Sequence, residues 1–459
     1  MARNTGIKIS SSSLRRRKFL KMLGLAAVAT TGIPGIIDPL NFARAAIAPG
    51  EKGIYITDMY IGQLSGCGGV IVRLDTNKGI SGYGECREND SYVVTDLSYL
   101  KPAVIGMNPT QVDRVFDAMN NAILTYYDPR SAYSMSLIPP RSGALCGIEV
   151  ACWDIVGKVY NMPIWKLIGP KLRDKVRLYC DTTERTADTL PQYVQSRLDM
   201  GFRWFKADMT LTSLCTINTD YTSQSESGYP YTCYTIKDSG LQKFANYAGQ
   251  YRSLIGNDYP LSSDHYQGWA SKINLDVPSA VKLADLMLES NNQGMNGGWM
   301  EDIIQWWYPD QFAQVTAGTD MPILTGEDIY SFSELKPWID AGTLDYIHPD
   351  QASFGGIHET SRAASYAHSK GIFTALHCAG GPFSFAANLH IAAGIPDFLA
   401  LEYHHVDDSC NSWFDSVVDG FIRPFIQSDG HSYVPNGPGL GITPNATANS
   451  HGLSWTQVT

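Results

Sequence analysis

The feature that most constrains this chain is a series of short apolar strands between Asp264 and Glu402, each ending in an ionisable residue. Segments of roughly 20 to 40 residues, long enough for a helix and its loops, separate the strands. Strand and helix in alternation predict parallel strands joined by right-handed crossovers. Polar residues at successive strand ends are typical of the active face of a closed β/α barrel. The six strands are expected at residues 260–266, 299–303, 323–328, 346–350, 373–378 and 398–403.

Two earlier strands, at 176–183 and 202–209, bring the predicted number to eight. Residues 210–259 follow the second strand, and their polar, aromatic part lacks helical periodicity. We interpret this part as an insertion at the C-terminal rim of the barrel, where loops shape substrate access. The tail from 404 to 459 contains a turn-rich return strand at 436–442.

A smaller α+β module is expected to precede the barrel. Residues 52–83 alternate as in a sheet with tight turns, and helical patterns follow. A long helical run from 142 to 167 contains Gly147 and Ala151, which would allow close packing, and ends at Gly169-Pro170. The predicted organisation is a capping domain, a barrel and a C-terminal segment that returns to the capping domain, with bounds 46–170, 171–415 and 416–459.

Residues 1–45 have the features of a twin-arginine signal peptide. Arg16 and Arg17 precede a weakly apolar run, and Ala43-Arg44-Ala45 has the small-x-small form of a cleavage site. The apolar run is shorter than the roughly 20 residues that a spanning helix needs. We therefore expect a periplasmic or otherwise exported protein with no stable membrane association once the signal is cleaved.

The charge of the mature chain argues against polyanionic partners. Residues 1–45 hold eight of the 35 basic residues and one of the 45 acidic residues, which leaves 27 basic and 44 acidic residues and a net charge of −17. Such a surface repels phosphate backbones and anionic lipids, so we expect no nucleic-acid partner. A small anionic substrate would need local positive charge in its site.

The nine cysteines include no Cys-x-x-Cys pair, so the sequence suggests neither a zinc site nor a thioredoxin-type motif. Most lie in apolar surroundings that are typical of small core residues. Cys215 and Cys233 bracket the polar insertion, and an exported protein could bridge them. The sequence leaves that disulfide open.

Three carboxylates close three consecutive strands: Asp264, Glu301 and Glu327. Three carboxylates that meet in one barrel mouth cannot all stay ionised without a cation. Oxygen ligands suit Mg²⁺, which leaves coordination positions for substrate oxygens. A single carboxylate would more simply cap a loop or pair with a basic residue, but three at successive strand ends predict a metal site.

Asp350 and His377 close the next two strands. Neighbouring strands lie about 4.8 Å apart, so the two side chains can form a hydrogen bond that fixes the imidazole tautomer and leaves one nitrogen free to move a proton. Lys206 closes the second strand and could hold a carboxylate or act as a second acid or base. Glu402 ends the eighth strand and could bond to substrate, although a rim carboxylate is an equal alternative.

The order of these strand ends resembles the enolase superfamily, in its mandelate-racemase-like subgroup. The segments LTGEDIY, HPDQASFGGIHET and ALHCAGGPFSFAANLHIAA are similar to acid-sugar dehydratases of the galactonate and mannonate type. The resemblance covers roughly residues 52–445. It implies an α/β fold, a modified TIM barrel of the (β/α)7β kind with an N-terminal α+β capping domain, and a symmetric homo-oligomer. It also implies Mg²⁺ on Asp264, Glu301 and Glu327, and a catalytic dyad of Asp350 and His377.

Three positions depart from the family pattern. Trp204 stands where the racemases have the first lysine of Lys-x-Lys, so only Lys206 remains. Tyr266 occupies the position that often holds the acid histidine of the sugar dehydratases, and His265 is one residue early, on the opposite strand face. Asp302 follows Glu301 where the family commonly has proline.

The residues thus favour a Mg²⁺-dependent lyase that removes the proton α to the carboxylate of a sugar acid and then eliminates the β-hydroxyl. Lys206, His265, Tyr266 and His377 are the candidate acids for that elimination. An epimerase of α-hydroxy acids would use the same intermediate with reprotonation by Lys206. A non-catalytic sugar-acid binding protein is the third alternative, although binding alone would not need a His–Asp pair.

Overall fold

The computed structural model describes residues 53–87, 91–126, 139–223, 232–265, 273–290, 298–306 and 308–459. The expected signal peptide and Tyr266 lie outside the described residues. Within these ranges, we find no helix that combines the length and the hydropathy of a membrane span.

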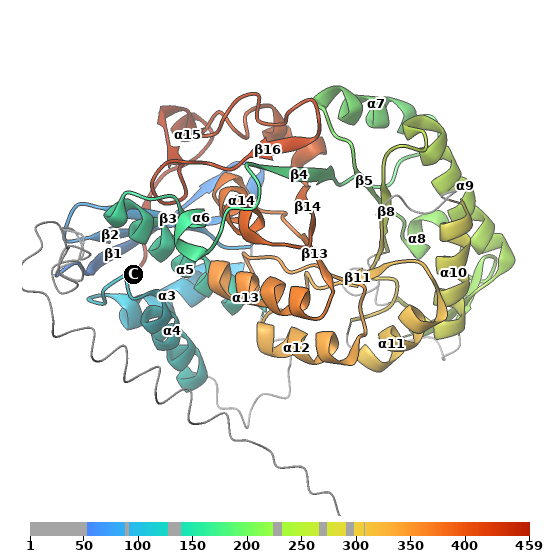
Figure 1. Cartoon of the computed structure of the whole chain (residues 1–459), viewed down its shortest axis with the longest axis horizontal. Helices are drawn as coiled ribbons and strands as arrows, with labels where there is room; N and C mark the ends of the chain where they lie inside the picture. The colour runs from blue at the N-terminus through green and yellow to red at the C-terminus, as the bar shows by residue number, and fades with distance from the viewer. Residues whose placement is uncertain are drawn as a thin grey trace, which may run out of the picture. The chain divides into compact units, whose positions relative to one another are not determined.

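Eight parallel strands form a closed barrel, as predicted from the alternation of strands and helices (Figure 1). The ring closes where the last strand pairs with the first, with Leu401 opposite Leu178. In spatial order the strands are β4 (Lys175–Cys180), β5 (Phe205–Asp208), β8 (Leu261–Asp264), β10 (Met300–Glu301), β11 (Ile323–Thr325), β12 (Tyr346–Ile347), β13 (Phe373–Leu376) and β14 (Phe398–Tyr403).

Helices connect the strands and cover the barrel from outside (Figure 1). Their buried residues, such as Phe244 and Phe312, join the outer faces of the strands in one continuous core. The crossover helices are α7 (Leu190–Met200), α9 (Asp238–Ile255), α10 (Val277–Ser290), α11 (Pro309–Gly318), α12 (Phe332–Ala341), α13 (Gly356–Ser369) and α14 (Pro382–Gly394).

The inside of the barrel has an aromatic layer that supports the strand ends. Trp204 and Trp299 pack with ring centroids 5.0 Å apart, and the Trp204 indole N–H donates to Ser262 Oγ at 2.9 Å. We call the whole packed set the aromatic layer, although it also contains aliphatic residues. Its members are Tyr179, Trp204, Trp299, Leu324, Ala375, Leu399 and Ala400. The position of the missing first lysine is therefore part of the packed interior.

The polar insertion contains more regular structure than the sequence indicated. After the short helix α8 (Leu211–Leu214), strands β6 (Tyr221–Ser223) and β7 (Thr232–Ile236) pair antiparallel, and β7 pairs in parallel with β9 (Ile273–Leu275) from the next loop. Cys215 and Cys233 are free thiols in this structure. A strand pairing between two separate loops leaves no local pattern in either one.

The N-terminal region is an antiparallel sheet of β1 (Ile56–Leu64), β2 (Cys67–Thr76) and β3 (Ser81–Glu85), covered by α3 (Ser91–Val104), α4 (Val112–Tyr126) and α5 (Pro139–Tyr160). The close packing expected at Gly147 is confirmed, because a Cβ on Gly84 would lie 2.0 Å from the Gly147 carbonyl oxygen. The long predicted helix ends at Tyr160, and α6 (Ile164–Ile168) is separate, since Asn161 has a φ of 53°.

The end of the chain contributes to both regions. Strand β16 (His431–Tyr433) pairs antiparallel with β4 of the barrel, β15 (Val418–Asp419) pairs with β17 (Thr443–Pro444), and the short helix α15 (Ala446–Ser450) follows. Strand β18 (Thr456–Gln457) then pairs antiparallel with β1, so the last residues complete the N-terminal sheet.

Candidate active site

Strand register brings the acidic strand ends together. Asp208 is opposite Asp264 across β5 and β8, and Asp264 is opposite Glu301 across β8 and β10. All three side chains are buried. Buried carboxylates in register repel one another, and burial together with the charge of Glu301 raises the pKa of Asp264 well above its usual range.

Lys206 is the cation at the centre of these carboxylates. Its Nζ lies 2.9 Å from Glu402, 3.1 Å from Asp264 and 3.3 Å from Glu301. Burial opposes its charge, but Glu301 and Glu402 outweigh burial and raise the pKa of Lys206 well above its ordinary value. The ammonium is therefore held protonated and holds three strand ends in place.

His377 is the second base of the mouth and shares the Glu402 carboxylate with Lys206. Its Nδ1 is 2.7 Å from Asp350, which is the hydrogen bond expected between the two strand ends, and its Nε2 is 2.6 Å from Glu327 and 3.4 Å from Glu402. Burial alone would lower the pKa of His377, but Glu327 and Glu402 raise it well above the usual value. We call Lys206, Asp264, Glu301, Glu327, Asp350, His377 and Glu402 the charged cluster.

A second histidine fixes one member of this cluster. His348 Nδ1 is 2.8 Å from Glu301 Oε1, and its Nε2 is 2.8 Å from the hydroxyl of Tyr179. Both ring nitrogens of this buried side chain therefore have partners. The chain of bonds joins Glu301 to the aromatic layer below and orients its carboxylate toward the mouth.

The N-terminal region contributes one side chain to the cluster. Arg87 Nη1 donates to the Glu327 carbonyl oxygen at 2.7 Å, and the guanidinium lies 3.5 to 3.9 Å from the carboxylates of Glu327, Asp328 and Asp350. Although burial opposes its charge, Glu327 and Asp350 raise the pKa of Arg87. Arg87 thus brings a positive charge from the N-terminal region to three carboxylates of the mouth.

Backbone geometry is unusual beside the acidic ends of β10 and β11. Asp302 has a φ of 48°, which proline cannot adopt, and its Oδ1 accepts a 2.5 Å bond from the Thr325 hydroxyl. Oxygen atoms of Asp302, Glu327 and Asp328 all lie within 4.8 Å of one another. This conformation places a third carboxylate where the family pattern has none.

The acidic set fits a divalent cation. Asp264 and Glu301 already converge on one positive charge, the Lys206 ammonium, and Glu327 is held by His377 and Arg87. The predicted trio is not among the groups whose ligand atoms all lie within 4.8 Å of one another. Two buried oxygens at the mouth, Asp208 Oδ1 and Asp328 Oδ2, have no hydrogen-bond partner among the described residues. Such a donor set has the all-oxygen chemistry of Mg²⁺.

The structure separates one candidate acid from the cluster. His265 lies on the outer face of β8, with its Nε2 3.0 Å from Ser263 Oγ and its ring 5.7 Å from that of Phe244 on α9. Burial lowers the pKa of His265 to about 3. Alternation along the strand therefore holds, and His265 is not brought together with His377. Glu402, by contrast, contacts both Lys206 and His377.

Two families match this chain. The family described as mandelate racemase / muconate lactonizing enzyme, N-terminal domain, matches residues 57–169, and enolase C-terminal domain-like matches residues 191–448. The chain belongs to the enolase superfamily. Within that superfamily it is a member of the mandelate racemase and muconate lactonizing enzyme group, as the strand-end residues indicated.

Known relatives of this enolase-superfamily chain include sugar-acid enzymes. A D-xylonate dehydratase from Haloferax volcanii is 26% identical over 378 residues, covering 82% of each chain. A D-galactarolactone cycloisomerase from Agrobacterium fabrum is also 26% identical, over 83% of this chain and 89% of its own. A solved structure of an enolase from Pantoea ananatis with bound D-gluconate and Mg shares the fold, with a TM-score of 0.69 and 23% identity over 87% of this chain and 94% of its own.

Several side chains of this enolase-superfamily site were not singled out from the sequence. His348 lies within the strand predicted at 346–350, two residues before Asp350, so its position was the available signal. Asp181 and His404 follow the ends of β4 and β14 and form a 3.2 Å ion pair. Arg87 follows the last strand of a different sheet, and no spacing in the sequence connects it to Glu327.

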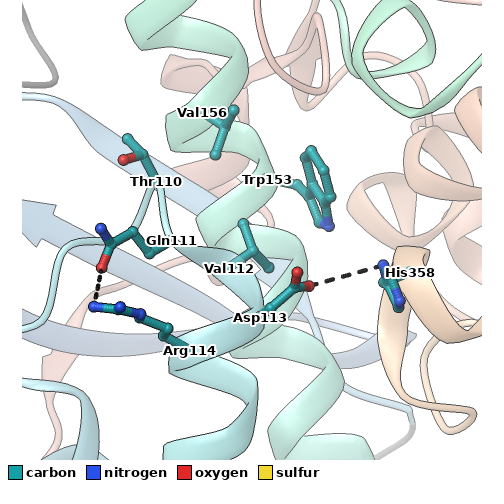
Figure 2. Close-up of a pocket in the computed structure, with 8 residues that line it drawn as sticks. All are labelled: Thr110, Gln111, Val112, Asp113, Arg114, Trp153, Val156 and His358. Carbon is teal, nitrogen blue, oxygen red and sulfur yellow. Dashed lines mark hydrogen bonds and ion pairs between the residues drawn. The ribbon is translucent and has the colours of Figure 1, made fainter. Parts of the chain in front are cut away.

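A separate surface hollow of about 350 Å³ lies away from the charged cluster (Figure 2). The start of α4 lines it together with Trp153 on α5 and His358 on α13. Figure 2 shows the two ion-pair and hydrogen-bond contacts there, Asp113 with His358 at 3.9 Å and Arg114 with Gln111 at 3.3 Å. None of the charged cluster lines this hollow, so it is not the candidate active site.

Proposed function

We propose that this protein is a Mg²⁺-dependent dehydratase of a sugar acid, which removes the proton α to the carboxylate and eliminates the β-hydroxyl. The observation that carries the proposal is the position of His377, bonded to Asp350 on one nitrogen and facing Glu327 and Glu402 with the other. A binding protein would need no proton-carrying imidazole at this place, whereas His is the side chain most often used for proton transfer in catalysis.

His377 is proposed to move a proton at the face of the substrate that it contacts. Asp350 holds Nδ1 and so fixes the tautomer and the ring orientation. The mouth-facing Nε2 carries the proton, and Glu327 and Glu402 keep the imidazole charged while they remain its partners. A charged imidazole is an acid suited to protonating a leaving hydroxyl, and the neutral ring is the matching base.

Lys206 is proposed as the second proton carrier of the mouth. Its ammonium is surrounded by Asp264, Glu301 and Glu402 and is held protonated, which makes it a donor of hydrogen bonds and of protons. Of the four acids considered from the sequence, Lys206 and His377 belong to the charged cluster, whereas His265 lies outside the barrel wall.

Mg²⁺ would be held by Asp264, Glu301 and Glu327, and it would supply positive charge that stabilises the carboxylate as the α-proton leaves. Arg87 adds a second positive charge from the N-terminal region. His348 orients Glu301, so the ligand carboxylate keeps one direction whether or not substrate is present. The sugar-acid dehydratases among the relatives support the reaction class.

An epimerase is the second candidate, and the observation that favours it is the presence of a second proton carrier, Lys206, in the same cluster as His377. Two proton carriers on opposite sides of one carbon are what inversion requires. The absence of the first lysine, whose position Trp204 fills in the aromatic layer, weighs toward dehydration.

A screen of aldonic and aldaric acids, each with and without Mg²⁺, tests the proposal. We expect at least one acid to be consumed only when Mg²⁺ is present, and chelation with EDTA to stop its consumption. Binding of a sugar acid without turnover or α-proton exchange, in the presence of Mg²⁺, would instead support the binding-protein alternative.

We further propose that the protein is exported through the twin-arginine pathway and begins near Ala46 once it is mature. The motif that contains Arg16 and Arg17 supports this proposal. Replacement of both arginines by lysine should leave the precursor in the cytoplasm. Normal export of that variant would contradict the proposed route.

A further inference from the structure

Two cysteines that are far apart in the sequence meet outside the charged cluster. Cys67 begins β2, directly after the turn of the first hairpin, and Cys410 lies in the 3-10 helix Ser409–Ser412 that follows the barrel. Both thiols are buried, and each sulfur lies within 4.8 Å of the other and of a ring nitrogen of His405. The cluster joins the N-terminal sheet to the C-terminal part of the chain.

His405 is engaged in a way that disfavours metal binding. Its Nδ1 is 2.7 Å from Asp408 Oδ2 and its Nε2 is 3.0 Å from the Gly380 carbonyl oxygen. Two acceptors on one ring require both nitrogens to be donors, so the ring is an imidazolium with no free lone pair. Burial opposes this charge, but the bonds to Asp408 and Cys410 raise the pKa of His405 to about 10.

The imidazolium changes the chemistry of the nearby thiols. A hydrogen bond from Cys67 and the bond and charge of His405, acting against burial, lower the pKa of Cys410 to about 6. Thiolates are the nucleophilic form of cysteine, and a neighbouring cation is the usual reason for their formation in proteins.

We propose that Cys67 and Cys410 are a redox pair that closes into a disulfide between the first hairpin and the C-terminal part of the barrel. Hydrogen peroxide oxidises the Cys410 thiolate to a sulfenic acid and is itself reduced to hydroxide. The Cys67 sulfur then attacks the Cys410 sulfur. One S–S bond forms, the S–O bond breaks, and the hydroxyl leaves as water with the proton of the Cys67 thiol.

The backbone of the first hairpin holds Cys67 close to the segment that carries Cys410. Cys67 lies between Gly66 and Gly68, whose φ values of 70° and 69° favour glycine. A Cβ on Gly66 would lie 3.1 Å from Ser409 Oγ, and one on Gly68 would lie 2.3 Å from the Gly381 nitrogen. The hairpin therefore lies directly against both the cysteine-bearing helix and the loop that follows His377.

A second pair of neighbouring thiols provides a natural control. Cys86 and Cys146 are both buried, and Cys146 is close enough to affect the ionisation of Cys86. Burial and the proximity of Cys146 raise the pKa of Cys86 well above its usual value. Because Cys86 stays a thiol, this pair should oxidise far more slowly although its sulfurs are also neighbours.

The test is a peroxide titration of the reduced full-length protein, followed by thiol counting under denaturing conditions and by peptide mapping. We expect the nine thiols to fall to seven, with one linked peptide pair containing Cys67 and Cys410 and a mass loss of about 2 Da that dithiothreitol reverses. The Cys67→Ser variant should form no linked peptide pair, because its oxidised Cys410 has no partner thiol, and oxidation should raise the Tm of the wild-type protein only. His405→Gln should slow the linkage about tenfold or more, because the thiolate fraction falls.

Three outcomes would overturn the proposal. Linkage of Cys86 to Cys146 at an equal rate would show that proximity alone determines oxidation. Conversion of Cys410 to sulfinic acid without linkage would show that the sulfurs cannot meet. One equivalent of Zn²⁺ that protects both Cys67 and Cys410 would assign the cluster to metal binding. The wild-type map decides between these outcomes even where a variant fails to fold.

Discussion

The aromatic layer inside the barrel and the charged cluster above it come from the same strands and differ in almost every physical property. In the aromatic layer, rings pack edge to face, and a buried polar atom such as the Trp204 indole nitrogen has a neutral partner. In the charged cluster, buried carboxylates raise the pKa values of Lys206 and His377 and so hold both bases protonated. One strand thus supplies both a residue that stabilises the fold and a residue of the candidate active site. Substitutions in the aromatic layer should mainly change stability, and substitutions in the charged cluster should mainly change turnover.

The largest expected effect is the loss of a ligand in the charged cluster. Glu301→Gln should reduce Mg²⁺-dependent turnover about 10³-fold or more, because an amide no longer offers the negative charge that binds the cation. The variant should remain folded, since it removes one of several mutually repelling carboxylates. The exposed Glu289 supplies the control Glu289→Gln, which should leave turnover unchanged. Metal-dependent turnover at the wild-type rate in Glu301→Gln would contradict the ligand assignment.

The next largest effect concerns proton transfer. His377→Asn should preserve Mg²⁺ binding and lower the rate at least about 10²-fold, which is the lower range of a general acid–base contribution. His368 forms a similar pair with Asp397, at 2.5 Å on the exposed surface of α13, so His368→Asn is a matched control that should have little effect. Equal losses of rate in the two variants would contradict the role of His377 in proton transfer.

A substitution in the aromatic layer should lower stability and leave turnover nearly unchanged. Trp204→Phe should lower the free energy of unfolding by about 1–2 kcal/mol, because a cavity replaces part of the indole and its bond to Ser262 is lost. Turnover per folded molecule should change less than about threefold, since the charged cluster is untouched. Urea denaturation and steady-state rates measure the two effects, with the partly exposed Trp413→Phe as a control. A large loss of turnover without a loss of stability would mean that the two layers are not separable.

The last comparison distinguishes burial from charge. His390 on α14 is as deeply buried as the charged cluster, but it accepts a bond from the Trp165 N–H and donates to the Leu440 carbonyl, so it is neutral. Burial lowers the pKa of His390 to about 4. The unfolded chain therefore binds a proton that the folded protein does not, and stability should fall as the pH decreases from about 6.5 to 4, by up to about 1.4 kcal/mol per pH unit. His390→Gln should flatten this part of the stability curve, and an unchanged slope would contradict the neutral state.

The sequence predicted those parts of the site that depend on one strand at a time. Asp264, Glu301 and His377 could be placed because each ends its own apolar strand, and strand alternation correctly put His265 on the other face. The fold class is confirmed for the same reason. The periodicity and spacing of apolar and polar residues within one segment were sufficient for these predictions.

The remaining features depend on contacts between segments. The bond from His348 to Glu301 crosses between non-adjacent strands, and Arg87 reaches Glu327 from another sheet. The positive φ of Asp302 is a property of a folded backbone under tertiary constraint, and the β7–β9 pairing joins two loops. None of these produces a periodic pattern, so none could be predicted from local sequence.

The most direct test of the central claim is the structure of the product formed from the active sugar acid, read by NMR in D₂O with Mg²⁺. The charged cluster, with His377 as the proton carrier, predicts a 2-keto-3-deoxy acid whose formation stops in the His377→Asn variant. Recovery of only the C2 epimer, with deuterium at the α-carbon, would contradict the dehydratase and assign the same residues to an epimerase.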